Sequence, residues 1–158
     1  MNSISNYFNS LNVVPVSISY EFDPNDFLKA RELHSFDLNN EYIKERDEDL
    51  KSIANGITGY KGNVHINLSK PIRFEVEDDY QKVSNKITHA IVSMYELHAS
   101  NFAACNLLGI NISEQSKYTF EDIKRAQKKL EHRLNGLQKD FHSKLLEQYA
   151  NPVLRKLK

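Results

Sequence analysis

Residues 63–69 read NVHINLS, in which Val64, Ile66 and Leu68 alternate with polar residues. This period of two predicts a β-strand that directs its aliphatic side chains to one face. Residues 13–20, VVPVSISY, form the only comparable stretch and predict a second strand, with Pro15 at its start or at an unpaired edge. The sequence between the two strands is mostly helical in pattern, which makes it a crossover and predicts parallel pairing.

Two parallel strands do not form a complete sheet, because parallel sheets normally have several strands with both faces covered. Two interpretations remain open. The chain is either part of a larger α/β sheet or a mostly helical domain with a minimal sheet. In the first case, exposed strand edges and an uncovered apolar face would favour self-association.

The rest of the sequence predicts helices. Asp23 and Pro24 suit a helix start, and Gly56 suits the end of a second helix. Three-and-four spacing of apolar residues predicts a long helix, and Thr119 with Asp122 predicts an N-terminal cap further on. The first expected helix starts at residue 23. The others span 41–55, 79–98, 102–108, 119–134 and 137–151, and the last of them ends at Asn151-Pro152.

The 21 basic and 21 acidic side chains cancel over the 158 residues. This neutrality argues against a general nucleic-acid binder. The charge is nevertheless uneven, since residues 1–116 carry a balance of −6 and residues 117–158 a balance of +6. No signal peptide or membrane-spanning run is recognisable. The single cysteine, Cys105, is expected to be a buried apolar residue in a reducing, cytosolic setting.

No motif for a phosphate loop, a dinucleotide site, a zinc site or a serine hydrolase is present. The glycines at 56, 59 and 62, together with Lys61, could face an anion, or they could form an ordinary turn into a strand. The helix with Lys124, Arg125, Lys128 and Lys129 could lie against an anionic membrane, or this could be its solvated face.

Several of these stretches together resemble the glycerolipid acyltransferases, and in particular the C-terminal part of a bacterial glycerol acyltransferase-like family. Residues 13–16, VVPV, resemble that superfamily's fourth conserved block, and residues 69–72, SKPI, resemble the turn that ends its catalytic domain, with Ser69 in place of the usual glycine. The remaining similar stretches are residues 9–21, 28–33, 56–62, 97–102 and 149–153.

The resemblance implies acyl transfer from coenzyme A or acyl carrier protein to a glycerol-phosphate-type acceptor in phospholipid synthesis. The family uses the histidine of an H-x-x-x-x-D motif as general base. None of the six histidines is followed five positions later by aspartate, and no Glu-Gly-x-Arg block is present. No catalytic residue is therefore carried over. Val14, Pro15 and Val16 carry over as the border of an acceptor pocket.

The prediction is an α/β fold, with residues 1–75 as the C-terminal part of an acyltransferase-like domain and residues 76–158 as a helical C-terminal extension. We expect a fragment that is inactive alone. It would either act together with a separate N-terminal acyltransferase chain in trans or be the product of a split or interrupted gene. The alternative is a non-enzymatic helical module that docks on a membrane surface or a partner protein. The expected location is the cytoplasm or the inner face of its membrane, without a cofactor or metal.

Overall fold

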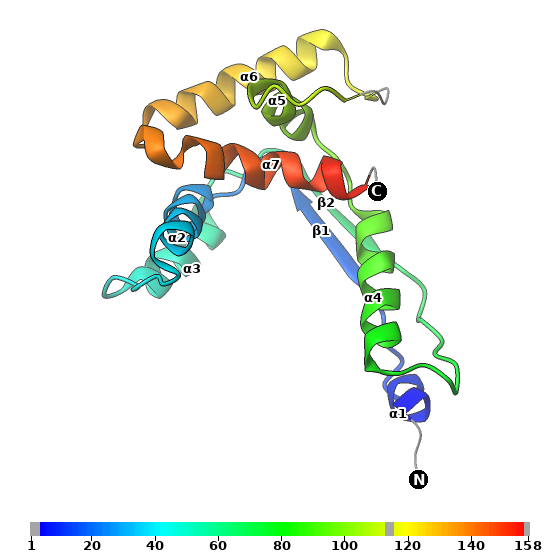
Figure 1. Ribbon diagram of the computed structural model, residues 1–158. Coiled ribbons are helices and arrows are strands. Elements are labelled where there is room, and N and C mark those ends of the chain that lie inside the picture. Colours follow the sequence, from blue (N-terminus) through cyan, green and yellow to red (C-terminus); the bar gives the residue numbers. More distant parts are fainter. Residues whose placement is uncertain (1–3, 113–115, 157–158) are drawn as a thin grey trace. The chain divides into compact units, whose positions relative to one another are not determined.

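The computed structural model describes residues 4–112 and 116–156 (Figure 1). In this part of the chain, seven helices and one two-stranded sheet form a mixed α/β fold with a helical C-terminal region, as predicted. The elements, in chain order, are α1 Ile4–Ser10, β1 Val16–Tyr20, α2 Asp26–Asn39, α3 Glu48–Thr58, β2 Val64–Leu68, α4 Tyr80–Met94, α5 Ala99–Leu107, α6 Phe120–Asn135, a 3-10 turn at Lys139–Phe141 and α7 His142–Lys156.

The two strands are antiparallel, so the prediction of parallel pairing was wrong. Backbone hydrogen bonds join Glu21 N to Asn63 O at 2.9 Å and Ser69 N to Pro15 O at 3.0 Å, one at each end of the pair. The reason lies in the connection between the strands. It contains two helices, α2 and α3, and the chain returns to the end of β1 from which it left. A single crossover helix would have taken the chain to the opposite end.

The chain forms two compact units, and each is built from two separate stretches. One combines Met1–Ser19 with Val64–Glu96, and the other combines Tyr20–Asn63 with Leu97–Lys158. We refer to them as the sheet unit and the helical unit. The sequence instead predicts a single domain boundary, after residue 75. This boundary stays a prediction.

Strand β1 buries the face opposite to the one that the sequence pattern suggests, whereas no residue of β2 is buried. Ser17 and Ser19 of β1 are each only 1% exposed. The aliphatic side chains of both strands, and that of Val14 just before β1, are 40–68% exposed: Val14, Val16, Ile18, Val64, Ile66 and Leu68. We call these six side chains the aliphatic sheet face. Ser17 Oγ has no hydrogen-bond partner among the described residues, so the buried side of the sheet is not optimised for stability.

Helix α1 packs into the sheet unit through specific contacts with residues far along the chain. The ring of Phe8 lies 5.7 Å from that of Phe74 and 6.4 Å from that of Tyr80. The Asn9 amide donates to Phe74 O at 2.9 Å and accepts from Phe74 N at 3.0 Å. These contacts hold a helix that the Asn- and Ser-rich sequence did not predict.

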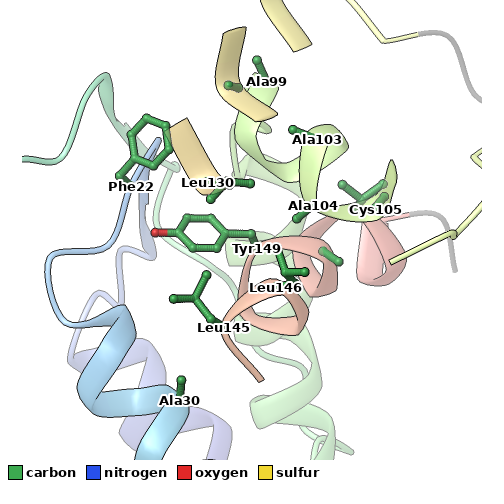
Figure 2. Packing of buried hydrophobic residues seen from close by; sticks show 13 residues of the cluster. Phe22, Ala30, Ala99, Ala103, Ala104, Cys105, Leu130, Leu145, Leu146 and Tyr149 are labelled. Carbon is green, nitrogen blue, oxygen red and sulfur yellow. The ribbon is translucent and has the colours of Figure 1, made fainter. Parts of the chain in front are cut away.

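The helical unit contains the principal hydrophobic core. Helix α5 packs on α6 and α7, and α7 also packs on α2 (Figure 1). Small residues of α5 allow the close approach, since Ala103, Ala104 and Cys105 are completely buried. Figure 2 shows Tyr149 of α7 among these side chains, with its ring between Leu130 and Leu145 and its hydroxyl directed away from α7.

A buried polar network joins α2, α6 and α7 at the edge of this core. The Asp26 carboxylate accepts hydrogen bonds from Arg133 and from the Tyr149 hydroxyl. That hydroxyl accepts in turn from Asp23 N at 2.9 Å. Burial and the adjacent Asp26 carboxylate raise the pKa of Tyr149. Every partner in the network is satisfied, as buried polar groups require.

Several helix boundaries differ from the predicted ones. Helix α2 begins at Asp26, because Asp23 and Pro24 form a turn before it, and α4 ends at Met94 rather than near His98. Gly56 lies inside α3, and Gly59 caps that helix. Pro152 does not end the last helix, which continues to Lys156 because the final turn buries Val153 completely.

Candidate functional site: a cationic cavity beside helix α6

Helix α6 carries the densest group of basic side chains, and its local sequence explains where it begins. Thr119 Oγ1 accepts a hydrogen bond from Asp122 N, and the Asp122 carboxylate accepts one from Thr119 N. This reciprocal cap, predicted from the sequence, lowers the pKa of Asp122 through the two hydrogen bonds from Thr119. Gly136 caps the other end.

The two sides of α6 have different environments. Its apolar stripe faces the core, with Ala126 at 2% and Leu130 at 0% exposure. The opposite side carries exposed basic residues one helical turn apart, Lys124, Arg125, Lys128 and Lys129, followed by His132. Because the apolar stripe is buried in the core, the exposed side of α6 is left to make electrostatic contacts.

A cavity of about 450 Å³ opens beside this basic side of α6, within the helical unit. Its walls come from α6 and from two aromatic residues far away in sequence, Phe22 and Tyr60. Phe22 is 1% exposed, whereas Tyr60 is 62% exposed. The two rings are stacked, with centroids 6.0 Å apart and planes inclined by 25°. The lining from α6 is Arg125, Lys128, Lys129, His132 and Arg133.

The aromatic rings position one of the lysines. Lys129 Nζ lies 5.3 Å from the centroid of Phe22 and 5.7 Å from that of Tyr60, and it donates to the Tyr60 hydroxyl at 3.3 Å. Such cation–π contacts orient an ammonium group without neutralising it. Lys129 is therefore held at the wall of the cavity.

Most of the positive charge in the cavity lacks an acidic counterpart. No carboxylate of the described residues is part of its lining. Within residues 4–112 and 116–156, neither Lys128 nor Lys129 forms an ion pair, and Arg125 has only a 3.8 Å contact with Asp122. Arg133 is the exception, because it pairs with Asp26. The cavity therefore combines an apolar floor with unpaired cations.

A second cavity, of about 510 Å³, shares Tyr60, Arg125 and Lys129 with the first. Its lining includes the carboxylates of Glu21 and Asp122. Glu21 is occupied, because its Oε2 accepts hydrogen bonds from both nitrogens of Asn63. In the second cavity, acidic side chains thus accompany the cations, unlike in the first.

The residues predicted to border an acceptor pocket lie elsewhere, in the sheet unit. Val14 and Val16 belong to the aliphatic sheet face, at 40% and 42% exposure. Pro15 between them is buried, and its carbonyl accepts from Ser69 N. Their role in binding an acceptor stays a prediction.

Lys61, the other predicted substrate-binding residue, contacts the end of α3. Its Nζ donates to Gly59 O at 3.1 Å and lies 3.5 Å from Ile57 O. These are carbonyls that the helix itself leaves unpaired. The contacts account for the position of Lys61 without a ligand, and anion binding by it stays a prediction.

Three of the four predicted membrane-surface residues line the cavity, and one does not. Arg125, Lys128 and Lys129 line it, while Lys124 does not. Lys124 Nζ instead lies 5.7 Å from the ring centroid of Phe120. Sequence reasoning did not identify Phe22, Tyr60 or His132 as site residues. The i, i+3 and i+4 spacing from Arg125 could have indicated His132, but no local signal points to the two aromatic residues.

Cysteine and histidine side chains offer no alternative centre. Cys105 is fully buried, as predicted, and burial raises the pKa of its thiol to about 11. His34 lies edge-on to Phe141, and buried His98 occupies the N-cap of α5. In the part of the chain that the structure describes, no three His, Cys, Asp or Glu residues come together as a metal site.

No helix in residues 4–112 and 116–156 is both long enough and apolar enough to cross a bilayer. Comparisons with protein-family models, with curated proteins and with solved structures find no match to this chain.

Proposed function

We propose that this chain is a non-catalytic part of a glycerolipid acyltransferase-like system and works with a second polypeptide segment that carries the H-x-x-x-x-D motif. The sheet unit would dock on that segment through the aliphatic sheet face. The donor would be an acyl thioester of coenzyme A or acyl carrier protein, and the acceptor a glycerol phosphate lipid, both handled by the assembled system.

The observation that carries the proposal is the orientation of the sheet. Five aliphatic side chains from two paired strands, together with Val14 just before β1, are exposed, while two serines of β1 are buried. Large exposed apolar patches generally mark interaction sites, because leaving them in water is unfavourable. A catalytic α/β segment supplies the apolar surface that such a face would bury.

The proposal predicts no acyl transfer by this chain alone, because its sequence lacks the general base that the family uses. Purified protein is incubated with acyl-CoA and glycerol 3-phosphate or a 1-acyl derivative, and thiol release is measured. Release clearly above that of heat-inactivated protein would overturn the non-catalytic assignment. If no release is seen, the DNA that flanks the coding sequence is searched for a reading frame that encodes the H-x-x-x-x-D motif. The product of that reading frame can be co-expressed with this chain and the assay repeated.

The docking surface can be tested on the chain by itself. With its partner segment missing, the aliphatic sheet face should cause self-association, which size-exclusion chromatography with light scattering detects. Ile18→Lys and Ile66→Lys place charges in the centre of that face and should shift the protein towards monomer. Val76→Lys is the matched control, since Val76 is 79% exposed in the same unit but lies outside the strands.

The two sets of variants separate the outcomes. Monomer formation by the sheet variants alone supports docking through the aliphatic sheet face. Monomeric unmodified protein, or an equal effect of Val76→Lys, contradicts it.

A second candidate function is electrostatic docking on an anionic membrane surface. It is favoured by one observation, the exposure of Lys124, Arg125, Lys128 and Lys129 on the same side of α6. Diffuse attraction of this kind depends on all four charges about equally. Co-sedimentation with anionic vesicles, with each lysine reversed in turn, tests it.

A further inference from the structure

We propose that the cavity between α6, Phe22 and Tyr60 is a binding site for a phosphate monoester group. It lies in the helical unit, and the argument for it does not depend on the acyltransferase proposal. The sequence contains no Glu-Gly-x-Arg block, so the site is not a retained part of that block.

The first argument is the local excess of charge. Arg125, Lys128 and Lys129 line one cavity that has no carboxylate in its walls. On an ordinary solvated helix face, cations are interspersed with acidic residues, as at Lys144 of α7, which pairs with Asp37 and Glu147. A phosphate dianion accepts several charge-assisted hydrogen bonds at once. This matches a cavity wall on which, among the described residues, Lys128 and Lys129 form no ion pair and Arg125 has only a 3.8 Å contact with Asp122.

The second argument is that part of the site is already ordered. The rings of Phe22 and Tyr60 hold the Lys129 ammonium, so its side chain loses less conformational freedom when an anion binds. The Asp26 carboxylate holds Arg133 at the inner wall in the same way. Fixed cations beside a partly apolar floor bind an anion more strongly than freely moving surface lysines.

The third argument concerns the size of the site and the organic part of the ligand. A volume of about 450 Å³ exceeds what one phosphate group fills. The floor consists of aromatic rings and lysine methylene groups, which favour an apolar group over water. A phosphate monoester with an apolar body fits these walls. It can come from a free organic phosphate or from the headgroup of phosphatidic acid in a membrane.

The experiment uses isothermal titration calorimetry of the full chain with phenyl phosphate and with inorganic phosphate. In parallel, the chain is sedimented with phosphatidylcholine vesicles that contain phosphatidic acid or an equal charge of phosphatidylserine, which has no phosphate monoester. Each assay is repeated with Lys128→Glu and with Lys124→Glu. The second variant is a matched control, because it makes the same charge change on the same helix outside the cavity lining.

Saturable phenyl phosphate binding that Lys128→Glu weakens about tenfold and Lys124→Glu weakens less than about twofold would support the site with a free ligand. Binding to phosphatidic acid vesicles but not to phosphatidylserine vesicles, with the same difference between variants, would support the lipid source. Tyr60→Leu removes both an aromatic wall and a contact that holds Lys129, so it should weaken phenyl phosphate binding more than inorganic phosphate binding.

Three results would overturn the proposal. One is the absence of binding to any of these probes. Another is equal loss with Lys124→Glu and Lys128→Glu, which indicates diffuse attraction to the helix surface. The last is equal binding to phosphatidic acid and phosphatidylserine vesicles without any phenyl phosphate binding. Circular dichroism of each variant confirms that the fold is retained.

Discussion

Arg133 donates two hydrogen bonds to the carboxylate of Asp26, from Nε at 2.6 Å and from Nη2 at 2.8 Å. The two residues are 107 positions apart in sequence, and Asp26 is only 1% exposed. The pair thus connects α2 to α6 at the edge of the core, beside the cationic cavity.

Arg133→Ala should lower the free energy of unfolding by about 3 kcal/mol, because it leaves the buried Asp26 carboxylate without its counter-charge. Urea denaturation of the purified protein measures the change. Arg31→Ala is the control. Arg31 and Glu45 likewise form a close ion pair, at 2.7 Å, but both of their side chains are exposed to solvent. That loss should stay below about 1 kcal/mol. Equal losses in the two variants would contradict a structural role for the buried pair.

Asn9→Ala should detach α1 from the sheet unit. The substitution leaves the backbone N–H and carbonyl of Phe74 without their partner, at a cost of about 2 kcal/mol. Hydrogen exchange of residues 4–10 should become much faster. Ser10→Ala, which removes only an exposed local bond to Tyr7 O, should leave the exchange rates unchanged.

Gly59→Ala and Gly56→Ala should change stability in opposite directions. A Cβ at position 59 would overlap Pro24 Cβ and the Asn55 carbonyl oxygen, so alanine there forces backbone movement. A Cβ at position 56 meets only Asn25 Nδ2, at 3.9 Å, inside helix α3. Gly56→Ala should therefore stabilise by about 0.5–1 kcal/mol, and thermal unfolding should show the contrast.

The thiol of Cys105 should be unreactive in the folded protein. Its side chain is completely buried, and a pKa of about 11 leaves almost no thiolate at neutral pH. A thiol reagent such as dithiobis-nitrobenzoate should modify it rapidly only in denaturant. Fast modification under native conditions would contradict the packing of α5.

Stability should decline as the pH rises above about 9, because two buried groups have a raised pKa in the folded state. Cys105 goes from an ordinary 9.0 to about 11, and Tyr149 is raised from 10.0. A raised folded-state pKa contributes stability below the unfolded value and loses it as the pH approaches the folded value. In Cys105→Ala, the decline should begin nearer pH 10. Urea midpoints measured from pH 8 to 11 test this order.

The sequence predicted those elements whose stability is local. The cap of α6 is predicted directly by Thr119 and Asp122. Helix α1 was missed because its Asn- and Ser-rich sequence favours a loop, whereas its stability comes from distant Phe74. Pro152 was misread for a similar reason, since the burial of Val153 outweighs the local cost of proline in α7.

The candidate site also consists of residues that local sequence predicts and residues that only the fold brings together. The cations of α6 were found from their helical spacing, which depends on α6 alone. Phe22 and Tyr60 lie on loops beside β1 and α3, and only the fold brings them to Lys129. Strand orientation was wrong because it depends on the path of α2 and α3 between the strands, which periodicity does not encode.

The outward aliphatic sheet face links the stability of the sheet unit to mass action. Any occupant that covers Ile18 and Ile66 binds only the folded strands, and it therefore adds free energy of unfolding in proportion to the logarithm of its concentration. The melting temperature of this chain should accordingly rise with protein concentration when copies cover one another. A cell that produces the occupant in limiting amounts would thereby also limit how much of this chain survives proteolysis.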